Sequence, residues 1–420
     1  MARSIGGYVG IGNPILAPDQ VFASPSNTAS GDGAATFTFS APDNEGLTSV
    51  TLYVIVAITS GAVAAAGAGT SSPITVTGLT NGTAYTFVIF AINDFGLSPG
   101  SFASDAVTPI AGRGLSFGGR NTPNQNQNVI EFVVIATTGN GTDFGDLQAS
   151  SETATGFSST TRGVMHETGS DHADVVSYVT VASAGNATDF GNRSENIKNS
   201  VGLSNNTRGL FTGGNTPSAT YKDVMDYFTI ASTGNATDFG NLSVGRKWMG
   251  ACASSTRGIT GMGGNESDSG SEGSDVIDYV TIASTGNAAD FGNLTAIRDS
   301  SSSGGASSST RGGQGGGRRS GNSDVIEYIT IASTGNAADF GNLVGAQAEP
   351  GCAAASNKTR INYFGGTDSP SENAINVMQY ITVATTGNAT DFGDLAGAGV
   401  GEALSKRKKN GALCNNHGGV

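Results

Sequence analysis

The 420 residues include 64 Gly and only 13% are charged, a composition that suits a turn-rich all-β protein better than a helical one. The formal net charge of −13 argues against nucleic acid as a partner, because phosphate binding needs clustered Lys and Arg. The most apolar run, residues 50–58, is far shorter than the ~20 residues of a membrane-spanning helix, so we expect no membrane insertion.

The first predicted elements follow an N-terminal arm, residues 1–17. Gly6-Gly7 and Pro14 prevent a regular element in this arm, and it is expected to dock onto another protein by strand addition. Apolar runs then alternate with Gly, Asn, Asp and Pro turns over residues 18–109, and strands at this spacing predict a β-sandwich. The strand candidates are 34–41, 49–58, 72–79, 83–93 and 104–109.

The second half of this region, SSPITVTGLTNGTAYTFVIFAINDFG and the residues up to Pro109, is similar to part of a fibronectin type III domain. Leu79 and Tyr85 match the tyrosine-corner pair of that family, which implies that the Tyr85 phenol bonds to nearby backbone. The Trp of the family's second strand is replaced by Phe39. The resemblance implies a spacer or adhesive module.

Repeats occupy the chain from Arg113 onward, with a period of about fifty residues, which indicates a blade-by-blade architecture. Each repeat contains an Arg-Gly strand, a central strand with an aromatic residue, a D-F-G piece and a small-residue piece such as 250–255. Large apolar residues on both faces of the central strand suit a strand between two neighbouring sheets. The D-F-G aspartates are Asp143, Asp189, Asp238, Asp290, Asp339 and Asp391.

The Arg-Gly strand with its terminal Gly pair, followed by two strands that each carry an aromatic residue, resembles the kelch repeat of β-propellers. The second repeat departs from the pattern with RGVMHETG, and Phe stands where kelch blades often carry Trp. The resemblance implies an all-β chain in which a kelch-like propeller occupies residues 110–420. The Gly pairs are Gly118-Gly119, Gly213-Gly214, Gly263-Gly264, Gly316-Gly317 and Gly365-Gly366.

Ring closure has two solutions. Residues 396–405 can supply the missing innermost strand of the first blade, which gives six blades, and residues 410–420 then look like an extra copy of the Gly-paired strand. Seven blades, the last incomplete, is the alternative. We favour six.

No catalytic, cofactor or metal residue stands out. The D-F-G aspartates are expected to accept hydrogen bonds from turn amides, with calcium at the Asp and Asn oxygens as the alternative. A loop with His166, Glu167, Asp171, His172 and Asp174 is interpreted as a solvated polar loop rather than a transition-metal site. The cysteines, Cys252, Cys352 and Cys414, are interpreted as small core residues.

The loops before the central strands vary in length and composition, whereas the Thr-Gly-Asn turns are uniform. Alternating strand direction places the variable loops on one face of the ring, and such loops are where propellers usually bind partners. Neutral drift in surface loops is the alternative. The candidate binding residues on this variable-loop face are Asn121, Asn126, His172, Tyr221, Asp268, Glu272, Arg318, Arg319, Asp368 and Glu372.

The motif TIASTGNATDFG, repeated with little change, resembles kelch-like propellers in virion structural proteins of marine bacteriophages. The resemblance implies a non-enzymatic, tail-associated virion protein present in several copies, which binds other tail proteins or a host surface glycan or receptor. Two alternatives stay open. One is a propeller enzyme acting on host surface polysaccharide, and the other is a host-encoded adhesin.

Overall fold

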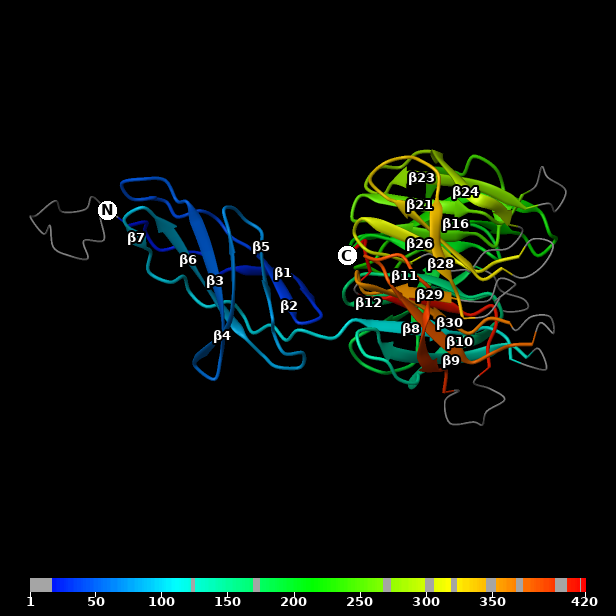
Figure 1. Cartoon of the computed structure of the whole chain (residues 1–420), viewed down its shortest axis with the longest axis horizontal. Helices are drawn as coiled ribbons and strands as arrows, with labels where there is room; N and C mark the ends of the chain where they lie inside the picture. Colours follow the sequence, from blue (N-terminus) through cyan, green and yellow to red (C-terminus); the bar gives the residue numbers. More distant parts are fainter. Residues whose placement is uncertain are drawn as a thin grey trace, which may run out of the picture. The chain divides into compact units, whose positions relative to one another are not determined.

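The computed structural model describes residues 17–121, 125–168, 174–266, 273–298, 306–318, 323–344, 353–367, 373–396, 406–415 and 417–420. The chain divides into two compact units, Met1–Ala111 (unit 1) and Gly112–Val420 (unit 2), both drawn in Figure 1. Every regular element in the described residues is a strand, which confirms the all-β prediction. No helix long and apolar enough to cross a membrane occurs in those residues.

Unit 1 consists of two antiparallel sheets around one core, with strand orders β1-β2-β5 and β4-β3-β6-β7. Alternate residues of β3 and β6 are buried, as expected for sheets that pack face to face, and Ile55 and Ile89 are fully enclosed. The strands are β1 (Ser26–Gly31), β2 (Ala34–Thr38), β3 (Leu52–Thr59), β4 (Ala62–Gly69), β5 (Ile74–Thr77), β6 (Thr86–Asn93) and β7 (Gly96–Leu97).

The tyrosine-corner contact is present in unit 1. The backbone N–H of Thr80 donates to the Tyr85 hydroxyl at 3.0 Å, and Leu79 is buried beside it. The core aromatic of the second strand is not Phe39, however. Phe37 is fully buried, with its ring centre 4.2 Å from that of Phe87, whereas Phe39, just past the end of β2, is only partly buried against the same core.

The strand predictions for unit 1 were wrong at one place and missed other strands. Residues 104–109 form only a bridge between Val107 and Tyr85, because the backbone there is held partly by the Ser104 hydroxyl, which accepts from the Phe87 N–H. Strands β1, β4 and β7 were not predicted. The Ala and Gly residues of β4 are weak strand formers, and this strand pairs along its length with β3.

Unit 2 contains six four-stranded antiparallel sheets, here called blades 1–6. Each blade runs from an inner small-residue strand through the Arg-Gly strand and the central strand to the D-F-G strand. From inner to outer strand, the blades are β33 (Gly411–Cys414), β8 (Arg113–Phe117), β9 (Gln127–Val134), β10 (Thr142–Ser151); β11 (Thr155–Ser158), β12 (Arg162–His166), β13 (Val175–Thr180), β14 (Thr188–Asn192); β15 (Val201–Ser204), β16 (Arg208–Asn215), β17 (Tyr221–Thr229), β18 (Thr237–Asn241); β20 (Gly250–Ala253), β21 (Arg257–Met262), β23 (Ser274–Thr281), β24 (Ala289–Arg298); β25 (Ala306–Ser307), β26 (Arg311–Gly315), β27 (Val325–Thr330), β28 (Ala338–Asn342); and β29 (Ala353–Ser356), β30 (Arg360–Phe364), β31 (Val377–Thr382), β32 (Thr390–Asp394). A short sheet pairs β19 (Arg246–Lys247) with β22 (Asn265–Glu266).

The repeat arginine joins each blade to the next. Its guanidinium lies 4.3–4.7 Å from the centre of the aromatic ring in its own blade, and its Nη1 donates to a backbone carbonyl of the following blade. The sixth bond returns to the first blade, so the contacts are cyclic and the blades form a propeller-like ring. The bonds are Arg113 to Ala182, Arg162 to Ile230, Arg208 to Ile282, Arg257 to Ile331, Arg311 to Val383 and Arg360 to Ala136.

The D-F-G tripeptide is a β-bulge in the outer strand. The ladder shifts register there, the Phe side chain enters the core, and the Gly adopts φ between 140° and 148°, where the next blade's turn packs against it. The expected role of the aspartate was wrong, because all six carboxylates are exposed and accept no turn amide in the described residues. The Asn of Thr-Gly-Asn accepts instead, from the preceding blade, as Asn235 does from the Asn192 N–H at 3.1 Å.

The ring is closed by β33, which pairs antiparallel with β8 as the inner strand of blade 1. Closure by residues 396–405 was therefore the wrong assignment, and 397–405 lie outside the described residues. Residues 410–420 do not form an extra Gly-paired strand either. A short strand of small residues fits the crowded axis, whereas a Gly-paired strand would need a blade of its own.

Side-chain sizes are complementary where neighbouring blades meet near the axis. In five blades the residue after the repeat arginine is Gly, and its missing side chain leaves room for a side chain of the preceding inner strand, as Gly209 does for Phe157. Blade 6 has Ile361 at this place, and the facing residue of blade 5 is the small Ala306, which shares a core cluster with it. In both examples, a large side chain on one blade thus faces a small residue on its neighbour.

We expect Gly209→Ala to destabilise unit 2 by about 2–3 kcal/mol, because the added methyl would overlap the Phe157 ring. Combining it with Phe157→Ala, which recreates the Ala306 arrangement, should cost at least 1 kcal/mol less than the sum of the single changes. Urea unfolding of the four proteins measures this coupling. Additive losses would show that the two positions do not constrain each other.

Candidate functional site

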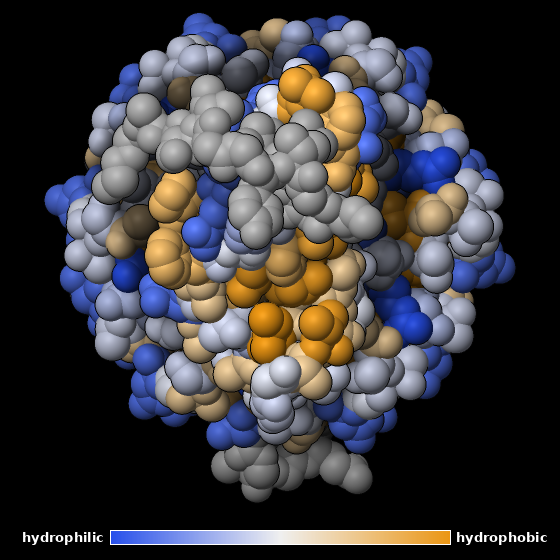
Figure 2. Space-filling view, turned by 90° about the vertical axis from the view of Figure 1, so that its left-hand side faces the viewer, coloured by the Kyte–Doolittle hydropathy of each residue, from blue (hydrophilic) through white to orange (hydrophobic). Residues whose placement is uncertain are grey.

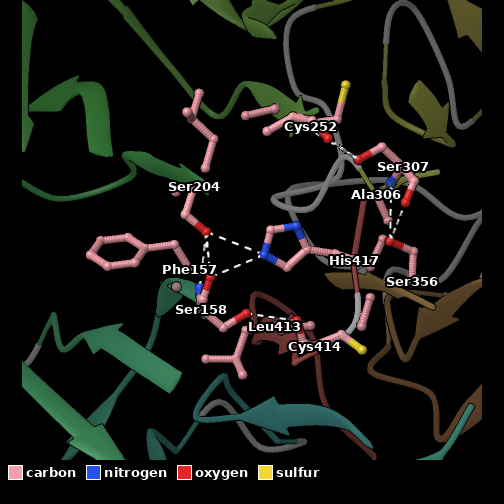
Figure 3. A pocket seen from close by; sticks show the side chains of 18 residues that line it. Phe157, Ser158, Ser204, Cys252, Ala306, Ser307, Ser356, Leu413, Cys414 and His417 are labelled. Carbon is pink, nitrogen blue, oxygen red and sulfur yellow. Dashed lines mark hydrogen bonds between the residues drawn. The ribbon is translucent and has the colours of Figure 1, made fainter. Parts of the chain in front are cut away.

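The six inner strands surround an axial cavity of about 50 Å³. Its lining is mainly Ala and Ser, and the serine hydroxyls donate to carbonyls of the preceding blade, so they are already engaged. Figure 3 shows these bonds between neighbouring strands. They are Ser158 to Cys414, Ser204 to Ser158, Ser307 to Ala253 and Ser356 to Ser307, each at 2.7 or 2.8 Å.

His417 contributes to the lining of this cavity from the C-terminal residues (Figure 3). Its Nε2 lies 3.1 Å from the Ser158 carbonyl and 3.2 Å from the Ser204 hydroxyl, while Nδ1 accepts the Gly419 N–H at 3.0 Å. A carbonyl only accepts, so Nε2 carries the proton. The Ser204–His417 pair therefore lacks the arrangement of a nucleophile and its base, because the serine proton points to Ser158 and Nε2 has no free lone pair.

Burial is the main cause that lowers the pKa of His417, to about 4, and nearby Lys358 lowers it further. The unfolded chain binds a proton below its ordinary pKa of 6.5 while the folded ring does not, so stability falls as the pH drops from about 6.5 to about 4. The full pKa shift corresponds to about 3 kcal/mol of stability; we expect about 1–2 kcal/mol because His417 as a whole residue is only half-buried.

Denaturant unfolding at a series of pH values checks this expectation. His417→Gln should flatten the stability profile between pH 6.5 and 5, where few carboxylates titrate. An unchanged slope in this variant would place the proton uptake elsewhere.

Four buried ion pairs join neighbouring blades. They lie near the face of the ring that carries the blade-to-blade connections and the variable loops. In each pair, an acid that precedes the central aromatic binds an arginine that lies between the D-F-G motif of the preceding blade and the next inner strand. No side chain of the eight exceeds 4% exposure. Burial lowers the pKa of Arg407 to about 10, a value at which the guanidinium is still charged at neutral pH. The pairs are Arg193–Asp226, Arg246–Asp278, Arg298–Glu327 and Arg407–Glu131.

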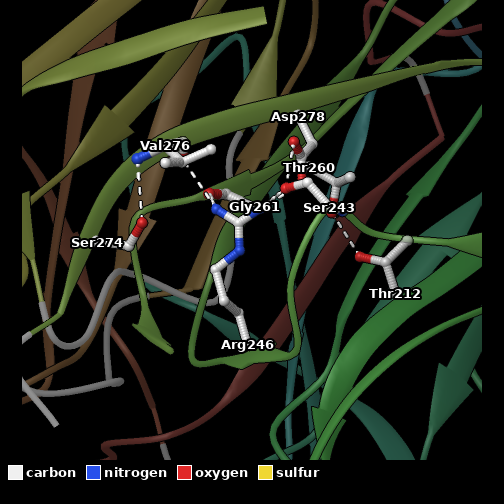
Figure 4. Close-up of polar contacts among 8 residues, drawn as sticks. All are labelled: Thr212, Ser243, Arg246, Thr260, Gly261, Ser274, Val276 and Asp278. Atoms are coloured by element: carbon white, nitrogen blue, oxygen red, sulfur yellow. Dashed lines mark hydrogen bonds and ion pairs between the residues drawn. The ribbon is translucent and has the colours of Figure 1, made fainter. Parts of the chain in front are cut away.

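Figure 4 shows the pair between blades 3 and 4. Besides contacting Asp278, Arg246 donates to the carbonyls of Gly261 at 3.0 Å and Val276 at 3.1 Å, and the Ser243 hydroxyl binds the same carboxylate. The network satisfies most of the polar atoms of both partners, as a buried charge requires.

At two interfaces the described residues contain no such pair. In blade 2 the acid is replaced by Ser177, whose hydroxyl donates to Glu167, and Glu167 also accepts the N–H of Ala149 at 2.9 Å. Burial raises the pKa of Glu167. In blade 6, Gln379 accepts the Val344 N–H at 2.6 Å. The interpretation of His166 and Glu167 as part of a solvated loop was therefore wrong, because both are fully buried at blade contacts.

The described members of the variable-loop candidates are not one cluster. Asn121 is buried and accepts the Gln125 N–H at 2.9 Å, so its side chain closes its own loop. Asn126 accepts from Arg120 at 3.1 Å, Tyr221 is half-buried at the start of β17, and Arg318 is half-buried after β26. The candidates outside the described residues are His172, Asp268, Glu272, Arg319, Asp368 and Glu372.

Tyr221 does belong to an aromatic group on this face. The Lys247 ammonium lies 4.8 Å from the Tyr221 ring centre and 4.1 Å from that of Trp248. Trp248 has φ of 60°, which is costly for a bulky residue, and the equivalent places in two other connections hold Asn199 and Lys409 at φ of 58°. The fold requires the backbone shape here, but it does not require Trp.

Sequence reasoning missed the buried arginines, Trp248 and His417. The recurring acid before the central aromatic was a visible signal for the ion pairs. Among the described residues, no group of three or more His, Cys, Asp or Glu side chains could hold a metal ion. No protein-family model matches the chain, and no curated protein matches it either.

Proposed function

We propose that this chain is a non-enzymatic, tail-associated structural protein of a bacteriophage virion, present in several copies, which binds a host surface or a neighbouring tail protein. The virion assignment rests on the resemblance of the repeat motif. The proposal for binding rests mainly on one observation: the recurring Arg, aromatic, Gly and Asn residues of the repeat are used in contacts within and between blades, so the repeat serves as a scaffold.

The residues that line the axial cavity favour a non-enzymatic role for the ring. The described inner strands present mainly Ala and Ser to the cavity, with Gly, Cys, Leu and Phe; the serine hydroxyls are engaged with carbonyls, and His417 is held neutral. Burial raises the pKa of the Cys252 thiol to about 12, so it is no nucleophile at neutral pH. A polysaccharide-cleaving enzyme would need acids at this axis, and no Asp or Glu is among the described residues that line the cavity.

The group of Tyr221, Lys247 and Trp248 is the part of the variable-loop face that we propose contacts the receptor. We expect Trp248→Asn, which copies Asn199, to leave unit 2 as stable as before and to weaken adsorption of the labelled chain to host cells at least tenfold. Lys409→Asn at the equivalent place between blades 6 and 1 is the control and should not change adsorption. Equal adsorption by all three proteins would remove this group from the contact.

The location is tested on gradient-purified particles encoded by the same genome. Mass spectrometry should find the chain there in several copies, and immunogold should label the tail. Absence from particles together with recovery from the host cell surface would favour the adhesin alternative.

A further inference from the structure

Exposed apolar side chains are concentrated in unit 1. Of the large hydrophobic residues exposed in the described part of the chain, all but Val344 lie there, including Leu47 at 64%, Phe95 at 47% and Leu97 at 53% exposure. Figure 2 views the molecule from the end of unit 1 that carries β7, and it shows hydrophobic side chains gathered on that face. Loop tips are usually polar, so this gathering marks an interaction surface.

Leu47, Phe95 and Leu97, here called the apolar pole, lie on two chain segments that the Asn93 side chain joins. The Asn93 amide donates to the carbonyls of Glu45 at 2.8 Å and Thr48 at 3.1 Å, which fixes the loop on either side of Leu47. Its Oδ1 accepts the backbone N–H of Phe95 at 2.9 Å and of Gly96 at 3.1 Å. Asn93 is itself buried, so the pole is shaped before any partner arrives.

The charge around the apolar pole has one sign. Residues 17–111 contain no Lys, Arg or His, whereas they contain Asp19, Asp32, Asp43, Glu45, Asp94 and Asp105. Asp43 and Asp94 are exposed and lie in the same two loops as the pole. This field repels a second copy of the pole, an anionic membrane and nucleic acid, and it attracts a basic surface.

We propose that the apolar pole docks a protein partner that presents apolar side chains flanked by Lys or Arg. The apolar residues supply the buried centre of the contact, and the acids steer and orient the partner. The inference concerns unit 1 alone and does not depend on where the chain resides.

Two amphipathic peptides with the same leucine positions test the chemistry, one with Lys and one with Glu at the polar positions. Fluorescence anisotropy should show that the full chain binds the Lys peptide at least tenfold more tightly, with an affinity that falls as salt is added. Phe95→Ser/Leu97→Ser should lose at least tenfold of this affinity, and Leu47→Ser, on the other loop, should lose part of it. Val344→Ser in unit 2 should lose none.

A matched pair of charge variants separates the pole from the general acidity of the chain. Glu45→Gln/Asp94→Asn should weaken binding of the Lys peptide severalfold, while Asp189→Asn/Asp238→Asn, which removes two exposed acids of unit 2, should not. Equal losses in both pairs, or equal binding of the two peptides, would overturn the proposal. So would a dimer of the wild-type chain that Phe95→Ser/Leu97→Ser dissolves, because the occupant would then be a second copy.

Discussion

A chain that lacks residues 406–420 is expected to lose the cooperative unfolding transition of unit 2. The deletion removes β33, so β8 loses its inner neighbour, and it removes Arg407, so Glu131 is left as a buried charge without its arginine. The second loss alone costs about 3–5 kcal/mol, which is comparable with the whole stability of many domains. Calorimetry of the shortened chain measures the effect.

Adding the deleted segment back as a peptide is the control for this experiment. A synthetic peptide of residues 406–420 should restore the transition in proportion to its concentration, and the same peptide with Arg407→Met should restore it less. Removing residues 1–16 should leave the transition of unit 2 in place. If the shortened chain unfolds at the temperature of the full chain, β33 does not close the ring.

Breaking the pair between blades 3 and 4 is expected to give the second largest effect. Arg246→Met leaves the Asp278 carboxylate buried at 0% exposure, with Ser243 as its remaining hydrogen-bond donor among the described residues, and we expect a loss of about 3–5 kcal/mol. Urea unfolding of unit 2 measures this loss.

The double variant Arg246→Met/Asp278→Leu distinguishes two causes of the loss in stability, an uncompensated buried charge and lost packing. It should recover most of the stability, to within about 1–2 kcal/mol of the wild type, because an apolar pair of similar volume needs no partner. Blade 6 already does without a carboxylate at this position, where it has Gln379. A double variant as unstable as Arg246→Met would attribute the loss to volume instead of charge.

The blade pattern could be predicted from sequence because it is local. The aromatic residue and the D-F-G bulge belong to one hairpin of fixed length, from Tyr178 to Phe190 in blade 2, so their spacing recurs in every copy. Contacts across connections of variable length could not be predicted in the same way. Arg193 and Asp226 belong to different repeats, and no constant spacing links their equivalents in other blades.

The closing strand carried a signal that was overlooked. In blades 2–6, the Ser or Asn side chain three residues before the repeat arginine accepts the backbone N–H of that arginine, as Asn205 does for Arg208 at 2.8 Å. Asn415 does the same for Arg113 at 2.8 Å, from the other end of the chain. The order of Leu413, Cys414 and Asn415 repeats that of Leu203, Ser204 and Asn205, which could have identified the inner strand of blade 1.

Binding residues were less predictable than the fold. Packing determines the repeated positions, but nothing in the repeat determines which loop residue meets a partner. Trp248 shows the difference, because its position is recognised only by comparing its backbone with that of Asn199.

Distances between spin labels on the uniform turns test the ring most directly. Cysteines introduced at Thr138 in blade 1, Thr285 in blade 4 and Thr386 in blade 6, with the native cysteines replaced by alanine, place labels on equivalent exposed turns. A closed ring predicts that the distance from blade 1 to blade 6 is shorter than that from blade 1 to blade 4. A longer distance from blade 1 to blade 6 would mean that the sheets form an open stack, and it would contradict the ring.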